Sequence, residues 1–393
     1  MLNTMVVCFE FLDNEPIENV ITCIHFKVDK VVFFGYHHVI QNQRSNTEKF
    51  LKKYCSVNDV KFFPLPLNDL QSVLKTMRKE IEHELGQGAK LYFDITGGES
   101  LILVAFGMLS KEFETPMHMY DIPNDKLIEL DEGAKLSISK DVVSQQVHLN
   151  LDRYIEMRGG IINYGLHKSI KKDGGEEFID DVAKMWLIAK KHIDYWNPFS
   201  DFLRVNMLPD TNLQVRKRTS RIIKALSESK TNINKTAKLN EIIDDLAEKG
   251  LLLDVDHANE IYRFRFKNQY IKDCLWEGGS ILELHTYQKQ KIISDDCRVG
   301  VHLDWDGIIH YQRGTDVINE IDVLSLKGNV PTFISCKSGK MGAQQALHAL
   351  YELETVTKRF GGKYAKKVLV TAVDIGKVYS ERASEMGIEI ITC

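Results

Sequence analysis

The chain has 393 residues, of which 44% are hydrophobic and 27% charged, with a formal net charge of −4 at pH 7. This length allows two or three domains with apolar cores, and the composition is that of an ordinary globular protein. The small negative charge excludes a protein that binds polyanions over its whole surface, so contact with nucleic acid requires a local basic patch.

Three further features bear on the compartment. No run of eighteen apolar residues occurs, which predicts that no segment spans a membrane. The N-terminus, MLNTMVVCFEFLDNE, has no basic region before its apolar run, so we expect a strand there and not a signal peptide. The seven cysteines are odd in number and lack CxxC spacing, which predicts reduced thiols in a cytoplasmic protein and no zinc site.

Residues 1–150 show strand and helix patterns in alternation. The runs MVVCFEF, KVVFFGY, VKFFPL and KLYFDIT are rich in Val and Phe, and helical candidates at 17–26, 46–54 and 67–85 lie between them. This alternation predicts a parallel sheet with crossover helices, a Rossmann-like α/β domain. In such sheets ligands bind beyond the carboxyl ends of the strands.

A glycine-containing motif, DITGGES at residues 94–100, follows one of these strands and precedes an apolar helix, LILVAFGMLSKEF. Two glycines before a helix N-terminus let backbone amides approach an anion closely. The alternative is a tight turn without a ligand. The chain has neither GxGxxG nor GxxxxGK[ST], so conventional dinucleotide or nucleoside triphosphate binding is weakly supported.

The motif resembles the [DN]xTGG[TS]K element of CARF domains, the sensors of cyclic oligoadenylates in type III CRISPR systems. The loop after the first strand (residues 12–19) and the segment after the second (residues 35–38) are similar to that family's ligand-facing segments. The resemblance implies a binding site made of Leu12, Asn14, Glu15, Tyr36, His37, Thr96, Gly97, Gly98 and Ser100.

Two positions of this site leave alternatives open. Glu99 and Ser100 stand where the family usually has Thr and Lys, so one phosphate contact is missing and we expect Glu99 to face outward. Tyr36 could stack on an adenine ring, or it could be a partly buried core residue.

Residues 151–210 are interpreted as a helical connector in which Trp186 and Trp196 pack a helix interface. Residues 211–275 then show the order helix, helix and two-stranded wing, which is similar to a winged helix-turn-helix. The first of these helices is expected to include the basic run around 216–224, whose side chains could contact phosphates. The alternative for this segment is a spacer.

The most informative stretch is NEIDVLSLKGNVPTFISCKSGK at residues 319–340, which predicts two adjacent strands joined by a turn at residues 327–329. Alternate residues of a strand share a face, so Glu320 lies on the side of Asp322, and Ser335 on the side of Lys337. Paired strands would bring carboxylates and an ammonium together, as at a divalent-metal site with a water-activating lysine. An ordinary hairpin with a solvated polar face is the alternative.

Residues 276–393 show a helix containing Glu283, two strands, a long helix, a strand, a helix and a final strand. This order resembles the core of PD-(D/E)xK nucleases, a restriction-endonuclease-like fold. The resemblance implies that Glu283 is the first-helix acid, Asp322 the metal-binding aspartate and Lys337 the lysine. Ser335 departs from the family's Asp or Glu. Either the metal site is weakened, or Glu320 supplies the missing carboxylate.

Over nearly its full length the chain resembles the CRISPR ancillary nucleases that join a CARF sensor to a PD-(D/E)xK effector. The resemblance implies a homodimer that binds cyclic tetra-adenylate across its two-fold axis. It also implies Mg²⁺ or Mn²⁺ held by Asp322 with Glu283 and Glu320, and cleavage of DNA, RNA or both. Two alternatives are a ligand-responsive DNA-binding regulator with an inactive nuclease fold and, less consistent with the motifs, a Rossmann enzyme acting on a nucleotide.

Overall fold

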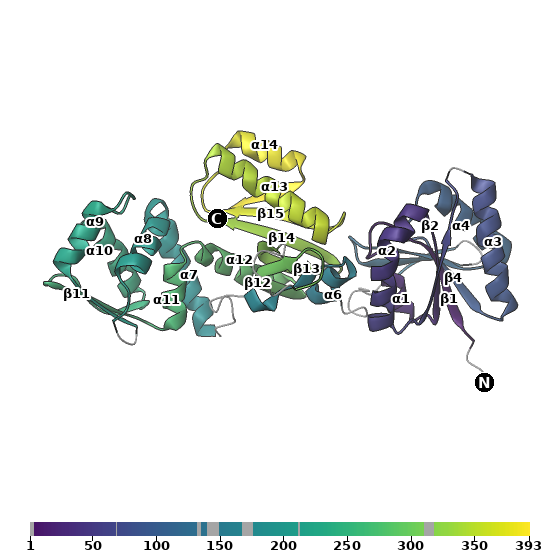
Figure 1. Ribbon diagram of the computed structural model, residues 1–393, viewed down its shortest axis with the longest axis horizontal. Helices are drawn as coiled ribbons and strands as arrows, with labels where there is room; N and C mark the ends of the chain where they lie inside the picture. The colour runs from purple at the N-terminus through teal and green to yellow at the C-terminus, as the bar shows by residue number, and fades with distance from the viewer. Residues whose placement is uncertain are drawn as a thin grey trace.

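The computed structural model describes residues 4–67, 69–131, 135–139, 149–166, 176–210, 213–309 and 318–393. The molecule is elongated, with the Rossmann-like domain (the sensor domain) at one end and a winged-helix segment at the other (Figure 1). A second α/β domain, the nuclease-like domain, lies between them. Within the described residues, no helix has the length and apolar character needed to cross a bilayer.

The sensor domain is built on a seven-stranded sheet of order β3-β2-β1-β4-β5-β6-β7. The first five strands are parallel, and β6 and β7 join as antiparallel neighbours. β1, β2 and the ends of their neighbours are buried on both faces, as parallel sheets require. The strands are β1 (Val6–Phe11), β2 (Lys30–Gly35), β3 (Asp59–Pro64), β4 (Lys90–Asp94), β5 (Met117–Asp121), β6 (Lys126–Leu130) and β7 (Leu136–Ile138).

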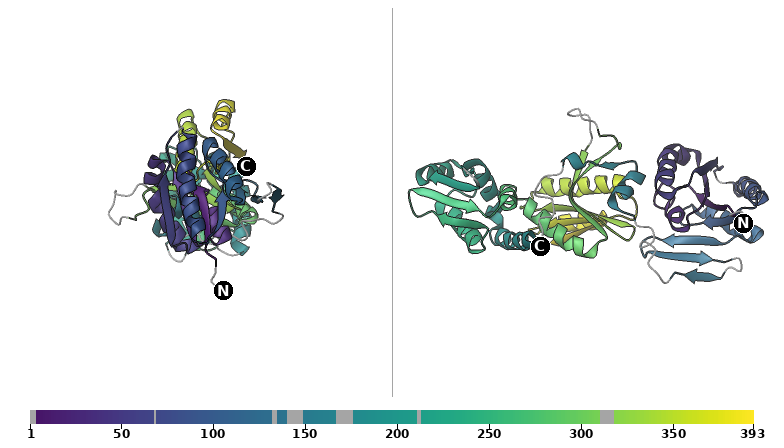
Figure 2. Two further views of the ribbon diagram at one scale, coloured as in Figure 1. Left: turned by 90° about the vertical axis from the view of Figure 1, so that its right-hand side faces the viewer. Right: turned by 90° about the horizontal axis from the view of Figure 1, so that it is seen from below.

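Helices cover both faces of this sheet, with α1 and α2 on one side and α3 and α4 on the other (Figures 1 and 2). The bounds are α1 (Ile21–Phe26), α2 (His37–Phe50) continued by a π-helical turn at Leu51–Cys55, α3 (Leu70–Gly86) and α4 (Ser100–Phe113). α3 begins at Leu70, three residues later than predicted, because the Asp69 side chain caps its first amides. The predictions for α1 and α2 are corrected: α1 starts four residues later than expected, after a turn, and α2 starts at His37 and not near residue 46.

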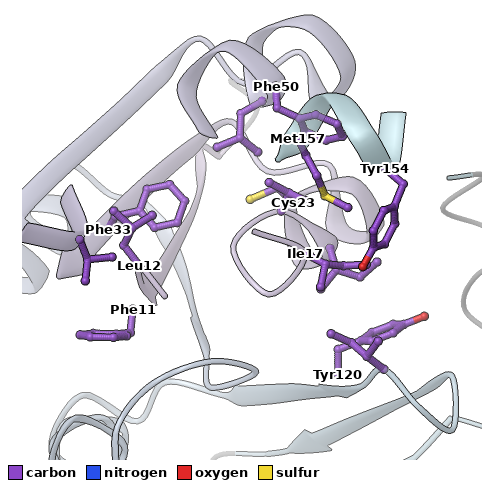
Figure 3. Close-up of a cluster of buried hydrophobic side chains, with 14 of the residues drawn as sticks. Phe11, Leu12, Ile17, Cys23, Phe33, Phe50, Tyr120, Tyr154 and Met157 are labelled. Atoms are coloured by element: carbon purple, nitrogen blue, oxygen red, sulfur yellow. The ribbon is translucent and has the colours of Figure 1, made fainter. Parts of the chain in front are cut away.

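The connector joins the sensor and nuclease-like domains through α6 (Leu151–Met157). Figure 3 shows Tyr154 and Met157 of α6 beside Ile17, Cys23 and Phe50 of the sensor domain. The short strand β8 (Ile161–Ile162) and a 3₁₀ turn at Tyr164–Leu166 follow, and then the helices α7 (Glu176–Lys191) and α8 (Ile193–Asn206). The connector is therefore packed into both neighbouring domains.

The winged-helix segment is confirmed in outline, with a three-stranded sheet of order β10-β11-β9. Its first element is a strand, since the basic run at its start forms β9 before the helix α9 begins at Thr219. The bounds are β9 (Gln214–Arg218), α9 (Thr219–Glu228), α10 (Thr236–Glu248), β10 (Leu252–Asp256), β11 (Ile261–Phe266) and α11 (Gln269–Trp276).

The nuclease-like domain contains a six-stranded sheet of order β16-β15-β14-β13-β12-β8. β12, β13 and β14 are antiparallel to one another, and β14, β15 and β16 are parallel. The bounds are α12 (Ser280–Ile293), β12 (Asp296–Asp304), β13 (Ile318–Lys327), β14 (Val330–Lys337), α13 (Ala343–Phe360), β15 (Lys366–Thr371), α14 (Lys377–Glu385) and β16 (Ile388–Thr392). The predicted hairpin is confirmed, and the predicted element order is corrected at one point: β12, a strand between α12 and the hairpin, was not predicted. The edge strand β8 comes from the connector.

The two faces of this sheet belong to different apolar cores. Leu324 and Phe333 pack with α13 in a core that continues into the sensor domain. Val323 and Ile334 pack with α12 in a core that continues through α7 and α8 into the winged-helix segment. The sheet that carries the predicted catalytic residues therefore lies between two apolar layers shared with its neighbours.

Candidate nuclease and sensor sites

The hairpin of β13 and β14 brings Asp322 next to Ser335. The ladder pairs Val323 with Ile334, so Asp322 lies opposite Ser335 one step further along. Asp322 Oδ2 accepts hydrogen bonds from the Cys336 backbone N–H at 2.6 Å and from Ser335 Oγ at 3.2 Å. Ser335, which stands where the family has Asp or Glu, thus orients the Asp322 carboxylate, a contact that the sequence does not indicate.

Glu283 approaches the same strand from the first turn of α12. Burial raises the pKa of the Cys336 thiol, and the charges of Asp322 and Glu283 raise it further, whereas Thr286 and Lys337 oppose the shift. Asp322 accepts from the Cys336 N–H, and Lys337 follows Cys336 at the end of β14. Glu283 lies on α12, which packs against the sheet in the core that contains Val323 and Ile334. The three predicted residues therefore lie on elements that meet at β14.

Lys337 is the last residue of β14 and lines a cavity of about 600 Å³ with Lys340, Gln344 and His348. In the part of the chain that the structure describes, the Lys337 ammonium has no carboxylate within 4.0 Å, so it is available to a ligand in the cavity. Gln345 has a structural role, because its side chain accepts from the Gly342 N–H and caps α13.

The far wall of this cavity comes from α8 of the connector. Asn197 Nδ2 donates to Ser338 Oγ at 3.3 Å, and Lys340 pairs with Asp194 at 2.8 Å. Sequence analysis missed both α8 residues. No local pattern around residue 197 could have indicated them, because the contact spans more than a hundred residues.

Glu320 occupies a different position from the other candidates. It pairs in register with His302 of β12, and its Oε2 lies 3.7 Å from His302 Nε2. This contact is on the β12 side of β13, whereas Ser335 lies on the β14 side. The placement favours the explanation in which the site is weakened at Ser335.

The donors suit a hard divalent cation. Among the described residues, no group of three His, Cys, Asp or Glu side chains is placed to hold a metal ion together. Mg²⁺ commonly binds proteins through one or two carboxylates and completes its octahedron with water and substrate phosphate. Asp322 and Glu283 are the two carboxylates from which such a site would be built.

The glycine motif of the sensor is held by a buried carboxylate. Asp94 Oδ1 accepts from the Thr96 N–H at 2.7 Å and from Thr96 Oγ1 at 2.6 Å, and Thr96 Oγ1 in turn accepts from the Tyr120 N–H at 2.9 Å. Gly98 has φ +122°, which side chains rarely adopt, so glycine is required there. The Gly97–Gly98 peptide is thereby fixed just before α4.

The predicted ligand residues divide into two groups. Asn14, His37 and Ser100 are exposed, and Thr96, Gly97 and Gly98 are half-buried around the same strand ends. Leu12 and Glu15 are buried, the first in the core and the second in an ion pair with Arg158. A ligand on the exposed surface could therefore reach the exposed and half-buried residues, but not the side chains of Leu12 and Glu15.

Tyr36 is a buried residue in this structure, which is the second of the two alternatives. Its ring packs edge-on against Phe11, with centroids 5.5 Å apart. The phenol donates to Glu99 Oε2 at 3.0 Å, and burial together with the Glu99 charge raises the pKa of Tyr36 to about 12. Glu99 is exposed, as expected, but this hydrogen bond holds its carboxylate against Tyr36.

Comparison with known proteins supports this division of the chain. Residues 273–393 match the family described as Card1-like, endonuclease domain. The chain is also similar to the crystal structure of protein VC1899 from Vibrio cholerae, with a TM-score of 0.72, 18% identity and coverage of 99% of this chain and 94% of that one. No curated protein matches.

A second similar structure is Can2 from Sulfobacillus thermosulfidooxidans in complex with cyclic tetra-adenylate. The TM-score is 0.66 at 14% identity, and the match covers 98% of this chain and 93% of that one. The predicted resemblance is thus confirmed at the level of fold, and residues 273–393 are similar to a Card1-like endonuclease domain.

Proposed function

We propose that this chain is a metal-dependent endonuclease of type III CRISPR antiviral defence that cyclic tetra-adenylate activates. The observation that carries the proposal is the gathering of Asp322, Glu283 and Lys337 within the segment that matches an endonuclease family. The fold shared with Can2, whose structure contains cyclic tetra-adenylate, supports the activator. A two-fold symmetric ring suits an isologous homodimer, in which each copy supplies half of the binding surface.

In this proposal Asp322 and Glu283 hold Mg²⁺ or Mn²⁺, which when bound supplies charge stabilisation at the scissile phosphate. The Cys336 N–H and the Ser335 hydroxyl keep the Asp322 carboxylate oriented through Oδ2, which leaves Oδ1 for a ligand. Lys337 reaches the cavity from the end of β14 and orients or deprotonates the attacking water. The substrate is DNA, RNA or both.

A chain of hydrogen bonds supports coupling between the two sites. Tyr120 of β5 donates its N–H to Thr96 of the glycine motif, and its phenol accepts from Asn329 Nδ2 at 3.0 Å. Asn329 is fully buried and lies in the turn between β13 and β14. A ligand that moves the glycine motif would therefore move the tip of the hairpin that carries Asp322 and Lys337.

The loop after β1 provides a second connection. Glu15 Oε2 accepts from the Lys363 N–H at 2.9 Å, and Glu18 pairs with the Lys363 ammonium at 2.6 Å and accepts from the Tyr364 phenol. These nuclease-like residues form the loop between α13 and β15. Thus both sensor segments near the predicted ligand surface contact loops of the nuclease-like domain.

The proposal is tested with plasmid DNA, single-stranded DNA and RNA in Mn²⁺, each with and without cyclic tetra-adenylate. We expect cleavage only when metal and activator are both present. Asp322→Asn should abolish cleavage and leave the affinity for the activator unchanged by calorimetry, because the activator surface lies in another domain. Cleavage retained by this variant would place the metal elsewhere.

Two further variants decide how the site compensates for Ser335. If the site is weakened, Ser335→Glu should lower the Mn²⁺ concentration needed for cleavage and Glu320→Gln should have little effect. The contact of Glu320 with His302 favours this outcome. If Glu320→Gln abolishes cleavage instead, Glu320 is the second carboxylate of the site.

One observation favours a regulator as the second candidate. On the outer face of the winged-helix sheet, Arg216 lies directly opposite Arg263, and Arg218 is exposed beside them. Like charges placed opposite each other destabilise a sheet, and Asp256, which pairs with Arg263 at 3.5 Å, offsets part of this repulsion. A nucleic-acid phosphate over Arg216 and Arg218 would offset the rest. Sequence-specific DNA binding without cleavage under any combination of metal and activator would identify the regulator.

A further inference from the structure

A polar cavity of about 370 Å³ lies where the sensor and nuclease-like domains meet. On the sensor side, it is lined by side-chain amides of Asn14 and of three α2 residues, Asn42, Gln43 and Asn46. Within the described residues, none of these four amides has a hydrogen-bond partner. The cavity therefore gathers amide groups that are free to donate to or accept from a ligand.

The opposite wall carries three cations, Arg158, Lys358 and Arg359. Only 8% of the Arg158 surface is exposed, and its Nε has no hydrogen-bond partner in the described part of the chain. Arg359 is held by the carbonyl oxygens of Arg158 at 2.6 Å and Trp305 at 2.8 Å. The Lys358 side chain is exposed at the rim.

The charges of this cavity do not balance. Glu15 forms an ion pair with Arg158 but does not line the cavity, and the described residues that line it include no carboxylate. Burial and the neighbouring charge of Arg359 lower the pKa of Arg158 to about 9. Two guanidinium groups are thus held close together, and their mutual repulsion and desolvation lower the stability of the fold. A bound anion would offset this loss.

We infer that this cavity, the junction pocket, binds a small ligand that carries a phosphate group. Guanidinium and ammonium groups are the usual partners of phosphate oxygens, and amides add neutral donors. The volume is at the low end for ligand cavities, which fits inorganic phosphate or a mononucleotide. The ligand would contact α2 of the sensor and the end of α13, and so would strengthen the connection between the two domains.

This inference is independent of the nuclease proposal, and its test uses no cleavage. The full chain is titrated with inorganic phosphate and, separately, with adenosine 5′-monophosphate in a calorimeter without metal. Binding of both probes identifies a phosphate subsite, and binding of the nucleotide alone shows that the nucleoside is contacted too. Lys358→Glu should weaken binding by about tenfold or more, because it replaces an attractive charge with a repulsive one.

Two variants sharpen the result. Glu15→Gln removes the carboxylate that competes with phosphate for Arg158, so it should tighten binding by several-fold. Lys49→Glu is the matched control, since Lys49 is an exposed cation of α2 that does not line the pocket, and it should leave binding unchanged.

Affinity for cyclic tetra-adenylate is measured with the same proteins. We expect Lys358→Glu to leave it unchanged. The inference is overturned if neither probe binds at millimolar concentration, if Lys358→Glu and Lys49→Glu act alike, or if Lys358→Glu abolishes activator binding, because the pocket would then belong to the activator site.

Discussion

The nuclease-like domain meets its two neighbours through junctions that differ in their buried polar contacts. Both junctions include an apolar core, but the sensor side adds buried charged contacts, with Glu15, Glu18 and Arg158 all at most 8% exposed. On the winged-helix side the main buried contacts are apolar and aromatic, with Trp196 and Phe199 buried and Trp186 stacked on His285 of α12. The sensor side therefore depends on directional charged contacts as well as packing, and the winged-helix side mainly on packing.

This difference predicts that the sensor-side junction can rearrange when a ligand binds, whereas the winged-helix-side junction keeps its packing. Buried ion pairs contribute little net stability, because desolvation offsets their attraction, and a ligand or water can replace either partner. Apolar burial has no preferred direction and is lost only when surface returns to water. A ligand signal is therefore expected to cross the sensor side, while the winged-helix side keeps α8 against the cavity that Lys337 lines.

The largest effect is expected from Trp196→Ala on the apolar side. The indole is 1% exposed, and its N–H donates to the Gly278 carbonyl at 3.0 Å. Removing a buried Trp typically costs about 3–5 kcal/mol. Urea denaturation should show this loss, and calorimetry should show unchanged activator affinity. A loss below about 1 kcal/mol would contradict the view of this side as a packed core.

A smaller effect is expected from Glu15→Gln on the polar side. The change keeps the acceptor for the Lys363 N–H but leaves the Arg158 charge without its carboxylate. Unpairing a buried charge costs about 3 kcal/mol. Added phosphate should restore part of this stability in thermal unfolding, whereas it should not restore Trp196→Ala. Equal responses of both variants would remove the contrast between the junctions.

Tyr120→Phe should affect coupling more than stability. Its hydroxyl accepts from Asn329 Nδ2, and the change leaves that buried amide unsatisfied, at about 1–2 kcal/mol. We expect near-normal activator affinity with a reduced ratio of activated to basal cleavage. Tyr92→Phe, on the neighbouring strand β4, is the control. If Tyr120→Phe is activated as fully as the control, the contact with Asn329 does not transmit the signal.

The smallest effect is expected in the pH dependence of folding stability and involves Glu18. Burial raises the pKa of Glu18, although Lys363 and Tyr364 oppose the shift. A raised pKa means that the folded protein holds this proton more tightly than the unfolded chain. The resulting stability is complete below the ordinary carboxyl pKa of about 4.3 and is lost as pH rises through the folded value. Glu18→Gln should therefore gain stability relative to wild type between pH 4 and pH 7, and a flat difference would contradict this.

Sequence patterns predicted the parts of the structure that local rules determine. The β13–β14 hairpin follows from alternation and its Gly-Asn turn, and the start of α3 was predicted to within three residues. The start of α2 was missed because HHVIQNQRSN has little apolar periodicity, and β9 was assigned to a helix because its run of basic residues has no strand signature.

Some residues of the candidate site could likewise be predicted from the sequence, and others could not. Asp322, Glu283 and Lys337 could be identified because a motif and an element order place them. Asn197, Arg158 and Asn329 could not, since each depends on contacts between segments that lie far apart in the sequence. The position of Glu320 beside His302 likewise depends on which strand becomes its neighbour.

The edge strand β8 has a consequence for anyone who wishes to produce the nuclease-like domain separately. It pairs with β12 through Leu303 and Asp304, although it precedes β12 by more than a hundred residues. A fragment of residues 273–393 would keep α12 and α13 but lose this strand and the side chains that the rest of the chain contributes to both apolar cores. A bare edge beside exposed apolar surface is a site of intermolecular strand pairing. Such a fragment should therefore aggregate on expression, and the domain is better studied by inactivating the sensor than by removing it.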